Sequence, residues 1–326
     1  MRHAFKIGMV FPVLLAAQQV PTIRVPVRLV SVPTLVYSAG NRLIPGLEST
    51  DFRVFDNGRL QDVTLDTTST RVSLAVAIQV NQEVREYVPF IAKVGSVLDA
   101  LLAGESGETA VIAYRGEVET VKPFGSGDVG TALARIPPSG RKARMIDAGM
   151  RALAMLKERP ASHARVLLLI GQPMDDGSES GLDALREGAE AENVTVYAVA
   201  LPELNKAFVS DTFSLQGLSS RSDRGGFQAG VDLGKLIPTA SRGSAAEAAT
   251  DPFSTLTGAT GGRQFHVRKQ RELEGALATM GVELRSTYLL SYTPSSTETG
   301  YHNIRVEVDV PGAKAYARPG YWMSRN

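Results

Sequence analysis

Residues 74–83 read Leu74-Ala75-Val76-Ala77-Ile78-Gln79-Val80-Asn81-Gln82-Glu83, an apolar strand that runs into a polar tip. After this stretch, segments with the pattern of buried strands alternate with segments with the pattern of helices, which indicates βαβ units. The sequence therefore predicts an α/β fold with a doubly wound, mainly parallel sheet. In such a fold ligands bind at the carboxyl ends of the strands, so the polar tip marks the edge where a functional site is expected.

The α/β domain is predicted to span residues 71–285. Its strands are expected at 73–80, 109–114, 117–122, 165–170, 194–200 and 262–267, and its helices at 84–103, 144–158, 180–192 and 271–284. Residues 166–170 are continuously apolar, as expected of a central strand that is buried on both faces. Residues 203–250 are rich in Ser, Gly, Ala and Arg without a sustained period, and they predict a long insertion loop.

Both ends of the chain have β patterns. Residues 23–68 form a predicted amino-terminal β module, in which Asn57-Gly58 is a strong hairpin signal. Residues 286–322 are predicted to add further strands, with a clean alternation of apolar and polar residues at 304–310. We expect these late strands to pack with the amino-terminal module or to extend the sheet, so that the two ends of the chain meet.

Composition narrows the class of protein. The chain has 326 residues, of which 43% are hydrophobic, and this length suggests about two domains of roughly 150 residues each. The net charge of +1 favours neither nucleic acid nor anionic lipid as a partner. The chain has no cysteine, which excludes disulfides, thiol catalysis and iron–sulfur clusters.

Residues 1–17 have the pattern of a secretory signal peptide. Arg2 and Lys6 are basic, residues 7–15 are apolar, and Ala16-Ala17 supplies a small-residue cleavage zone. No later apolar run reaches the about 20 residues that a helix needs to cross a bilayer. The sequence therefore predicts an exported protein, secreted or periplasmic, without a membrane span after removal of the signal.

Seven segments, taken in order, carry a resemblance to a known family. They are Asp51-Phe52-Arg53-Val54-Phe55-Asp56-Asn57-Gly58, the strand at Leu74, Met145-Ile146-Asp147-Ala148, Thr260-Gly261-Gly262-Arg263-Gln264-Phe265, Tyr288-Leu289-Leu290-Ser291-Tyr292-Thr293-Pro294, Gly300-Tyr301-His302-Asn303-Ile304-Arg305-Val306 and Arg318-Pro319-Gly320-Tyr321. With this ordered set the chain resembles the von Willebrand factor A-related domain family described in acidobacteria. The resemblance implies a Rossmann-like A domain that binds other proteins, which in intact members carries a metal-ion-dependent adhesion site.

The resemblance also implies that this adhesion site is degenerate. The family's site uses an Asp-x-Ser-x-Ser strand tip, a threonine and a second aspartate, and the matching positions are occupied by Gln79, Asn81, Glu83, Ala143 and Gln172. All five depart from the family's pattern. Hard cations such as Mg²⁺ are held chiefly by carboxylates, and an amide is a poor substitute for one, so we expect a metal-free binding face.

Basic residues stand beside the missing threonine. Arg141 and Arg144 can present to a partner's carboxylate the positive charge that a metal would otherwise supply, because arginine suits bidentate carboxylate recognition. A solvated basic loop, neutralised by Glu83, is the plainer interpretation. The predicted protein-binding rim consists of Gln79, Asn81, Glu83, Arg141, Lys142, Ala143, Arg144 and Gln172.

Neither catalytic residues nor a metal or cofactor are predicted. Residues 125–130 spell the dinucleotide-binding fingerprint, but Asp147, the acidic residue about 20 positions on, lies inside a helix pattern instead of at a strand end. The Gly-x-Ser-x-Gly elbow is missing, and the four histidines are far apart in the sequence. Residues 175–179 are expected to cap the helix that begins near Ser180 rather than to bind calcium.

The sequence thus predicts a non-enzymatic protein-interaction module, and it leaves the partner and the oligomeric state open. Two alternatives stay open as well. One is a metal-dependent adhesion module in which Glu83, Asp175 and Asp176 replace the usual ligands. The other is a structural protein of the cell envelope, in which the domain is a spacer and the β ends assemble with neighbours.

Overall fold

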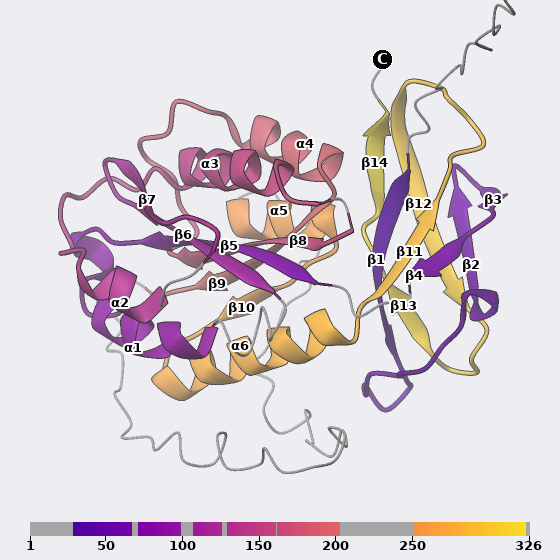
Figure 1. Ribbon diagram of the computed structural model, residues 1–326, viewed down its shortest axis with the longest axis horizontal. Helices are drawn as coiled ribbons and strands as arrows, with labels where there is room; N and C mark the ends of the chain where they lie inside the picture. Colours follow the sequence, from indigo (N-terminus) through magenta and orange to yellow (C-terminus); the bar gives the residue numbers. More distant parts are fainter. Residues whose placement is uncertain are drawn as a thin grey trace, which may run out of the picture.

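The computed structural model describes residues 29–66, 71–98, 107–125, 129–160, 162–202 and 251–323. The predicted signal peptide at 1–17 and the predicted insertion at 203–250 lie outside these residues. The described chain has two parts that lie side by side, an α/β domain and a two-layered β-sandwich (Figure 1). Within the described residues, no helix is long and apolar enough to span a membrane.

The α/β domain is built on one six-stranded sheet, in the order β10-β9-β8-β5-β6-β7. Its strands are β5 (Val72–Gln79), β6 (Glu108–Tyr114), β7 (Val118–Lys122), β8 (Ala164–Gly171), β9 (Val194–Ala200) and β10 (Gln264–His266). All neighbouring pairs are parallel except β6 and β7, which are antiparallel. Every residue of β5 is buried, as the apolar sequence of the strand requires at the centre of a covered sheet.

Helices cover both faces of this sheet, so the predicted doubly wound α/β fold is confirmed. One face is covered by α1 (Val88–Leu98), α2 (Val129–Ala134) and α6 (Gln270–Arg285), and the other by α3 (Met145–Lys157), α4 (Leu182–Ala191) and α5 (Pro252–Thr260). Successive side chains of β5 point to opposite faces of the sheet. Leu74, Val76 and Ile78 pack against α1, α2 and α6, whereas Ala75 and Ala77 pack against α3, α4 and α5. The small alanines let α3 pack closely on β5.

Two helical segments differ from expectation. Where a helix was predicted at 84–103, the structure has a short 3-10 helix (Gln82–Val84), and α1 begins only at Val88. The side chain of Asn81 caps the amino end of the 3-10 helix. Helix α5 was not predicted, although its signals are present in the sequence: Asp251 caps its amino end, Pro252 is its first residue, and Gly261 ends it with a φ of 78°. The helix was missed because these signals directly follow residues 203–250, which were interpreted as a long loop.

The β-sandwich is formed by both ends of the chain. One sheet, ordered β13-β1-β11-β4, contains β1 (Val30–Tyr37), β4 (Thr64–Asp66), β11 (Tyr288–Tyr292) and β13 (Lys314–Tyr316). The other, ordered β14-β12-β2-β3, contains β2 (Phe52–Asp56), β3 (Arg59–Gln61), β12 (Gly300–Val308) and β14 (Gly320–Met323). Asn57 and Gly58 both have positive φ, of 47° and 79°, as the tight hairpin between β2 and β3 requires.

Buried charges join the sandwich to the α/β domain. The Arg263 guanidinium lies 2.7 Å from the Glu283 carboxylate, and the Tyr37 hydroxyl of β1 donates to the same carboxylate at 2.7 Å. At a second point, Arg318 of the sandwich is buried and donates to the Glu190 carbonyl of α4 at 3.2 Å. These contacts hold the two parts together through groups that cannot reach water.

Candidate functional site

Three amide side chains meet at the carboxyl ends of β5 and β8. The Gln79 Oε1 accepts a hydrogen bond from the backbone N–H of Gln172 at 2.7 Å, and the Gln79 Nε2 donates to Asn81 Oδ1 at 3.0 Å. A longer contact of 3.4 Å joins Gln79 Nε2 to Gln172 Oε1. All three side chains are buried, so the polar tip predicted from the sequence is a closed amide network and not an open surface.

Neighbouring residues have roles that keep this network closed. The Asn81 Nδ2 donates to the carbonyl of Arg141 at 2.7 Å and to that of Lys142 at 3.3 Å, which ties the basic loop to the strand tip. The Asn81 Oδ1 also accepts from the Glu83 N–H at 3.2 Å. A Cβ atom at Gly171 would lie 2.7 Å from Gln79 Oε1, so only glycine leaves room for the network there.

The acidic loop after β8 caps a different helix from the one predicted. The Asp175 Oδ1 accepts from the Ile146 N–H of α3 at 2.9 Å, and the Ala143 N–H donates to Asp176. Gly181, the N-cap residue of α4, has no side chain, and no side-chain hydrogen bond caps that helix. The prediction that residues 175–179 cap the helix near Ser180 is therefore wrong: both carboxylates lie at the amino end of α3, where the helix dipole favours negative charge.

Arg144 is already paired within the protein. Its guanidinium lies 2.7 Å from the Asp147 carboxylate and 2.8 Å from that of Glu179. Burial alone would raise the pKa of Asp147, but hydrogen bonds from the N–H groups of Glu179 and Ser180 and from Arg144 outweigh it and lower that pKa. Asp147 and Glu179 thus neutralise Arg144, in place of the Glu83 that the sequence suggested.

The predicted rim residues therefore divide into two groups. Gln79, Asn81, Ala143 and Gln172 are buried, and Arg144 is held by its carboxylates. Arg141 and Lys142 are exposed, Glu83 is half-buried, and Met174 on the neighbouring loop is 43% exposed. Among the residues that the structure describes, no three Asp, Glu, His or Cys side chains gather as a metal site would need.

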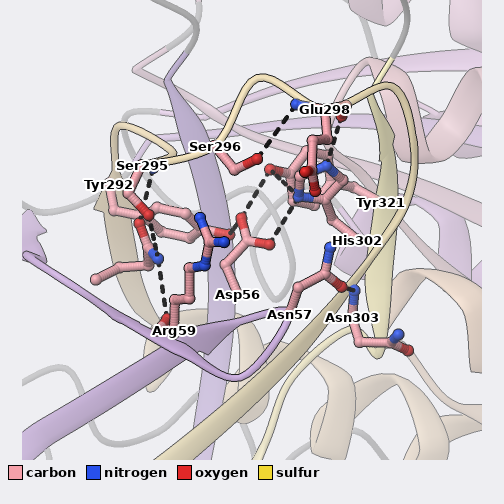
Figure 2. Close-up of polar contacts among 11 residues, drawn as sticks. Asp56, Asn57, Arg59, Tyr292, Ser295, Ser296, Glu298, His302, Asn303 and Tyr321 are labelled. Atoms are coloured by element: carbon pink, nitrogen blue, oxygen red, sulfur yellow. Dashed lines mark hydrogen bonds and ion pairs between the residues drawn. The ribbon is translucent and has the colours of Figure 1, made fainter.

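A second polar cluster, which the sequence did not predict, lies inside the sandwich. Asp56 at the end of β2 accepts hydrogen bonds from the hydroxyls of Tyr292 at 2.9 Å and Tyr321 at 2.8 Å, and its other oxygen lies 2.7 Å from Nδ1 of His302 (Figure 2). All four side chains are buried. Four of the segments that carry the resemblance each contribute one member, so these segments meet in one network.

The hydrogen-bond partners of His302 fix where one of its protons lies. Its Nε2 is 2.8 Å from the carbonyl oxygen of Glu298, which can only accept, so Nε2 carries a hydrogen. The Nδ1 shares a proton with Asp56 on the opposite side. With both nitrogens engaged and 1% of the residue exposed, His302 ties the 298–302 turn to the core and has no free atom for a ligand.

One further set of side chains includes the residue types of nucleophilic catalysis. The hydroxyl of Ser73 lies 2.7 Å from Glu108 Oε1 and 2.8 Å from His163 Nδ1. An ionised carboxylate only accepts, so the serine donates to Glu108 and accepts from the histidine. In a catalytic triad the histidine stands between serine and carboxylate, whereas here the serine does and is fully buried. This arrangement braces the start of β5.

The sequence matches no protein-family model and no curated protein. Among solved structures, the protein is similar to BatB from Bacteroides thetaiotaomicron, with 12% identity over 65% of this chain and 99% of that chain and a TM-score of 0.41. It is also similar to a von Willebrand factor type A protein from Catenulispora acidiphila, with 11% identity over 93% and 65% of the two chains and a TM-score of 0.43. A third neighbour is the VWA domain of SpRpn10, with 14% identity over 41% and 77% and a TM-score of 0.34. The structural neighbours thus include von Willebrand factor A domain proteins, and the likeness concerns the fold alone.

Proposed function

We propose that this chain is an exported, non-enzymatic interaction module that binds a protein partner without a metal ion, at the carboxyl-end rim of its parallel sheet. The observation that carries this proposal is the amide network of Gln79, Asn81 and Gln172. These are three of the positions that the resemblance assigns to metal ligands, and their polar groups bond to one another and to backbone.

The surroundings of the network support a metal-free face. A Mg²⁺ ion would have to replace buried hydrogen bonds with neutral amide oxygens as ligands, whereas hard cations are held chiefly by carboxylates. The two nearby carboxylates, Asp175 and Asp176, already accept N–H groups at the amino end of α3. Recruiting either of them to a cation would leave those backbone donors without partners, at a cost of about 1–3 kcal/mol each.

The exposed charges of the rim indicate what the partner presents. Arg144 is neutralised by Asp147 and Glu179, so the positive charge available to a partner comes from Arg141 and Lys142, both exposed. A guanidinium binds a carboxylate in bidentate fashion, which gives direction as well as attraction. The proposed partner is therefore a protein that places an aspartate or glutamate on the loop at Arg141.

Calorimetric titration of the mature, chelator-treated protein with Mg²⁺, Mn²⁺ and Ca²⁺ tests the metal-free part. We expect no binding at micromolar levels and no shift in melting temperature. The matched positive control restores the family's residues at the five positions: Gln79→Asp, Asn81→Ser, Glu83→Ser, Ala143→Thr and Gln172→Asp. Micromolar binding by the unmodified protein would instead favour the metal-dependent adhesion module.

Charge reversal tests the rim. The variant Arg141→Glu/Lys142→Glu is expected to lose a partner that the unmodified protein captures from cell-envelope extract by crosslinking. Arg151→Glu, which changes an exposed arginine of α3, is the control and should keep the partner. If the rim variant captures the same partner as the control, the interaction face lies elsewhere. The same result is expected if the domain is only a spacer in the cell envelope.

A further inference from the structure

The outer face of the sheet β14-β12-β2-β3 carries aromatic and apolar side chains that the proposed function does not use. Strand pairing sets Tyr301 opposite Trp322, and it sets Phe55 between Arg305 and Leu60. Side chains of directly opposed residues share one face of a sheet. The exposed fractions are 37% for Tyr301, 42% for Trp322 and 60% for Leu60, although most outward positions of a solvated sheet are polar.

The two largest rings on this face are held in a fixed arrangement. The ring centroids of Tyr301 and Trp322 are 5.7 Å apart with an interplanar angle of 64°, so one ring presents its edge to the face of the other. A Cβ atom at Gly320 would lie 2.6 Å from Cζ of Tyr301, so the glycine in β14 lets the tyrosine ring rest on the backbone. The pair forms a preset aromatic corner, where β12 and β14 lie side by side (Figure 1).

Planar polar groups continue the face along β12. Asn303 is exposed between the aromatic corner and Arg305, and the Arg305 guanidinium stacks over the Phe55 ring at 4.1 Å. The charges balance locally, because Arg305 pairs with Glu307, and Arg53 lies 3.8 Å from Glu307 and 4.0 Å from Asp309. The face thus offers rings and hydrogen-bonding groups with little net charge.

We infer that this outer face binds a neutral polysaccharide chain. The C–H bonds on one face of a sugar ring are weakly positive and match the negative face of an aromatic ring, here Trp322 or Tyr301. The hydroxyl groups at the edge of the sugar find the Asn303 amide and the Arg305 guanidinium. Tyr301 and Arg305 are four residues apart in β12, about 14 Å at strand spacing, so the face accommodates several sugar units in an extended chain.

The size and shape of the face favour a sugar chain over a protein or a membrane. An aromatic side chain carries about 150–250 Å² of surface, so each partly exposed ring offers on the order of 100 Å². A stable protein interface needs about 800 Å² per partner, several times more than these rings supply. Insertion into a bilayer needs an apolar surface that enters about 5–10 Å, whereas these rings lie on a flat sheet among paired charges.

The protein contains a single tryptophan, Trp322, so its fluorescence reports on this face alone. We would titrate the full chain with cellohexaose and with chitohexaose, using glucose as the monosaccharide control. The expected result is a saturable blue shift and protection from acrylamide quenching with at least one hexasaccharide, and a much weaker response to glucose. Tyr301→Ala, which keeps the reporter, should weaken binding about tenfold, the factor that 1.4 kcal/mol represents.

Three variants decide between a specific site and a general effect. Met174→Ala removes an exposed apolar side chain from the loop after β8 in the α/β domain and should leave sugar binding unchanged. Trp322→Ala should abolish retention in affinity electrophoresis, and Trp322→Phe should restore part of it, which separates lost stacking from lost folding. No emission change with either hexasaccharide, equal loss in Met174→Ala, or a blue shift produced only by phosphatidylcholine vesicles would overturn the inference. None of these outcomes depends on Arg141, so this experiment tests sugar binding independently of the proposed protein-binding rim.

Discussion

Asp56 is the centre of the buried hydrogen-bond network that joins the strands of the sandwich. Its two oxygens receive two tyrosine hydroxyls and one imidazole nitrogen from strands that are more than two hundred residues away in the sequence. Burial raises the pKa of Tyr292, with further contributions from Tyr321 and Asp56, so that hydroxyl stays a donor throughout the physiological range. A carboxylate with all its partners in place stabilises the packing of β2, β11, β12 and β14 around it.

Replacing Asp56 is expected to destabilise the protein strongly. Asp56→Ala removes the group that accepts from two buried tyrosine hydroxyls and contacts the His302 imidazole, and each buried polar group that loses its partner costs about 1–3 kcal/mol. Tyr292→Phe removes one hydrogen bond and should cost about 1 kcal/mol. Urea unfolding measures both changes, with the exposed Asp309→Ala as control. A loss below 1 kcal/mol in Asp56→Ala would show that the network contributes little.

At the scale of elements, the loop after β8 is fastened to the first turn of α3. Asp175 and Ser178 accept the N–H groups of Ile146 and Asp147, and Asp147 in turn accepts those of Glu179 and Ser180. The helix and the loop therefore cap each other. This reciprocal arrangement places Gln172 beside Gln79 and holds the basic loop at the rim.

Because these contacts lower the pKa of Asp147, its contribution to stability is present above the unfolded-state value and is lost as the pH falls toward the lower folded-state value. Unfolded aspartate has a pKa of about 3.9, so the loss begins below about pH 4. Asp147→Asn should cost about 1–3 kcal/mol at pH 7 and should show a shallower decline of stability in acid. Urea unfolding between pH 7 and pH 2.5 measures this.

The control for this prediction is Asp183→Asn, which changes a carboxylate in the first turn of α4 whose side chain is 87% exposed. Its pH dependence should follow that of the unmodified protein. Parallel curves for Asp147→Asn and the unmodified protein would mean that the carboxylate of Asp147 contributes nothing to the acid sensitivity of the fold.

At the scale of the whole molecule, the sandwich and the α/β domain share buried charges. Burial acts to lower the pKa of Arg263, but Glu283 together with Tyr37 and Tyr197 outweighs burial and raises this pKa, so the guanidinium stays charged. Burial lowers the pKa of Arg318 to about 10, which is still far above neutrality. A Cβ atom at Gly261 would lie 2.7 Å from the backbone nitrogen of Arg318, so the two parts touch backbone to backbone there.

The contact between the two parts is expected to make them unfold together. Arg263→Ala leaves Glu283 buried without its cation and should cost about 3–5 kcal/mol, whereas Tyr37→Phe should cost about 1 kcal/mol. Calorimetry should show one transition in the unmodified protein and a separate, earlier transition in Arg263→Ala. A double-mutant cycle with Tyr37→Phe measures the coupling, and additive effects would show that the tyrosine and the ion pair act independently.

The sequence by itself determined the class of fold, because the spacing of apolar residues reports which faces of a strand or helix are buried. It also identified the polar strand tip at 79–83 and the residue types there. The tertiary structure decided what those residues do: that Gln79 and Asn81 satisfy each other, that Asp175 caps α3 instead of α4, and that Asp56 meets His302 across 246 positions. Such contacts depend on the register between distant strands, which no local pattern encodes.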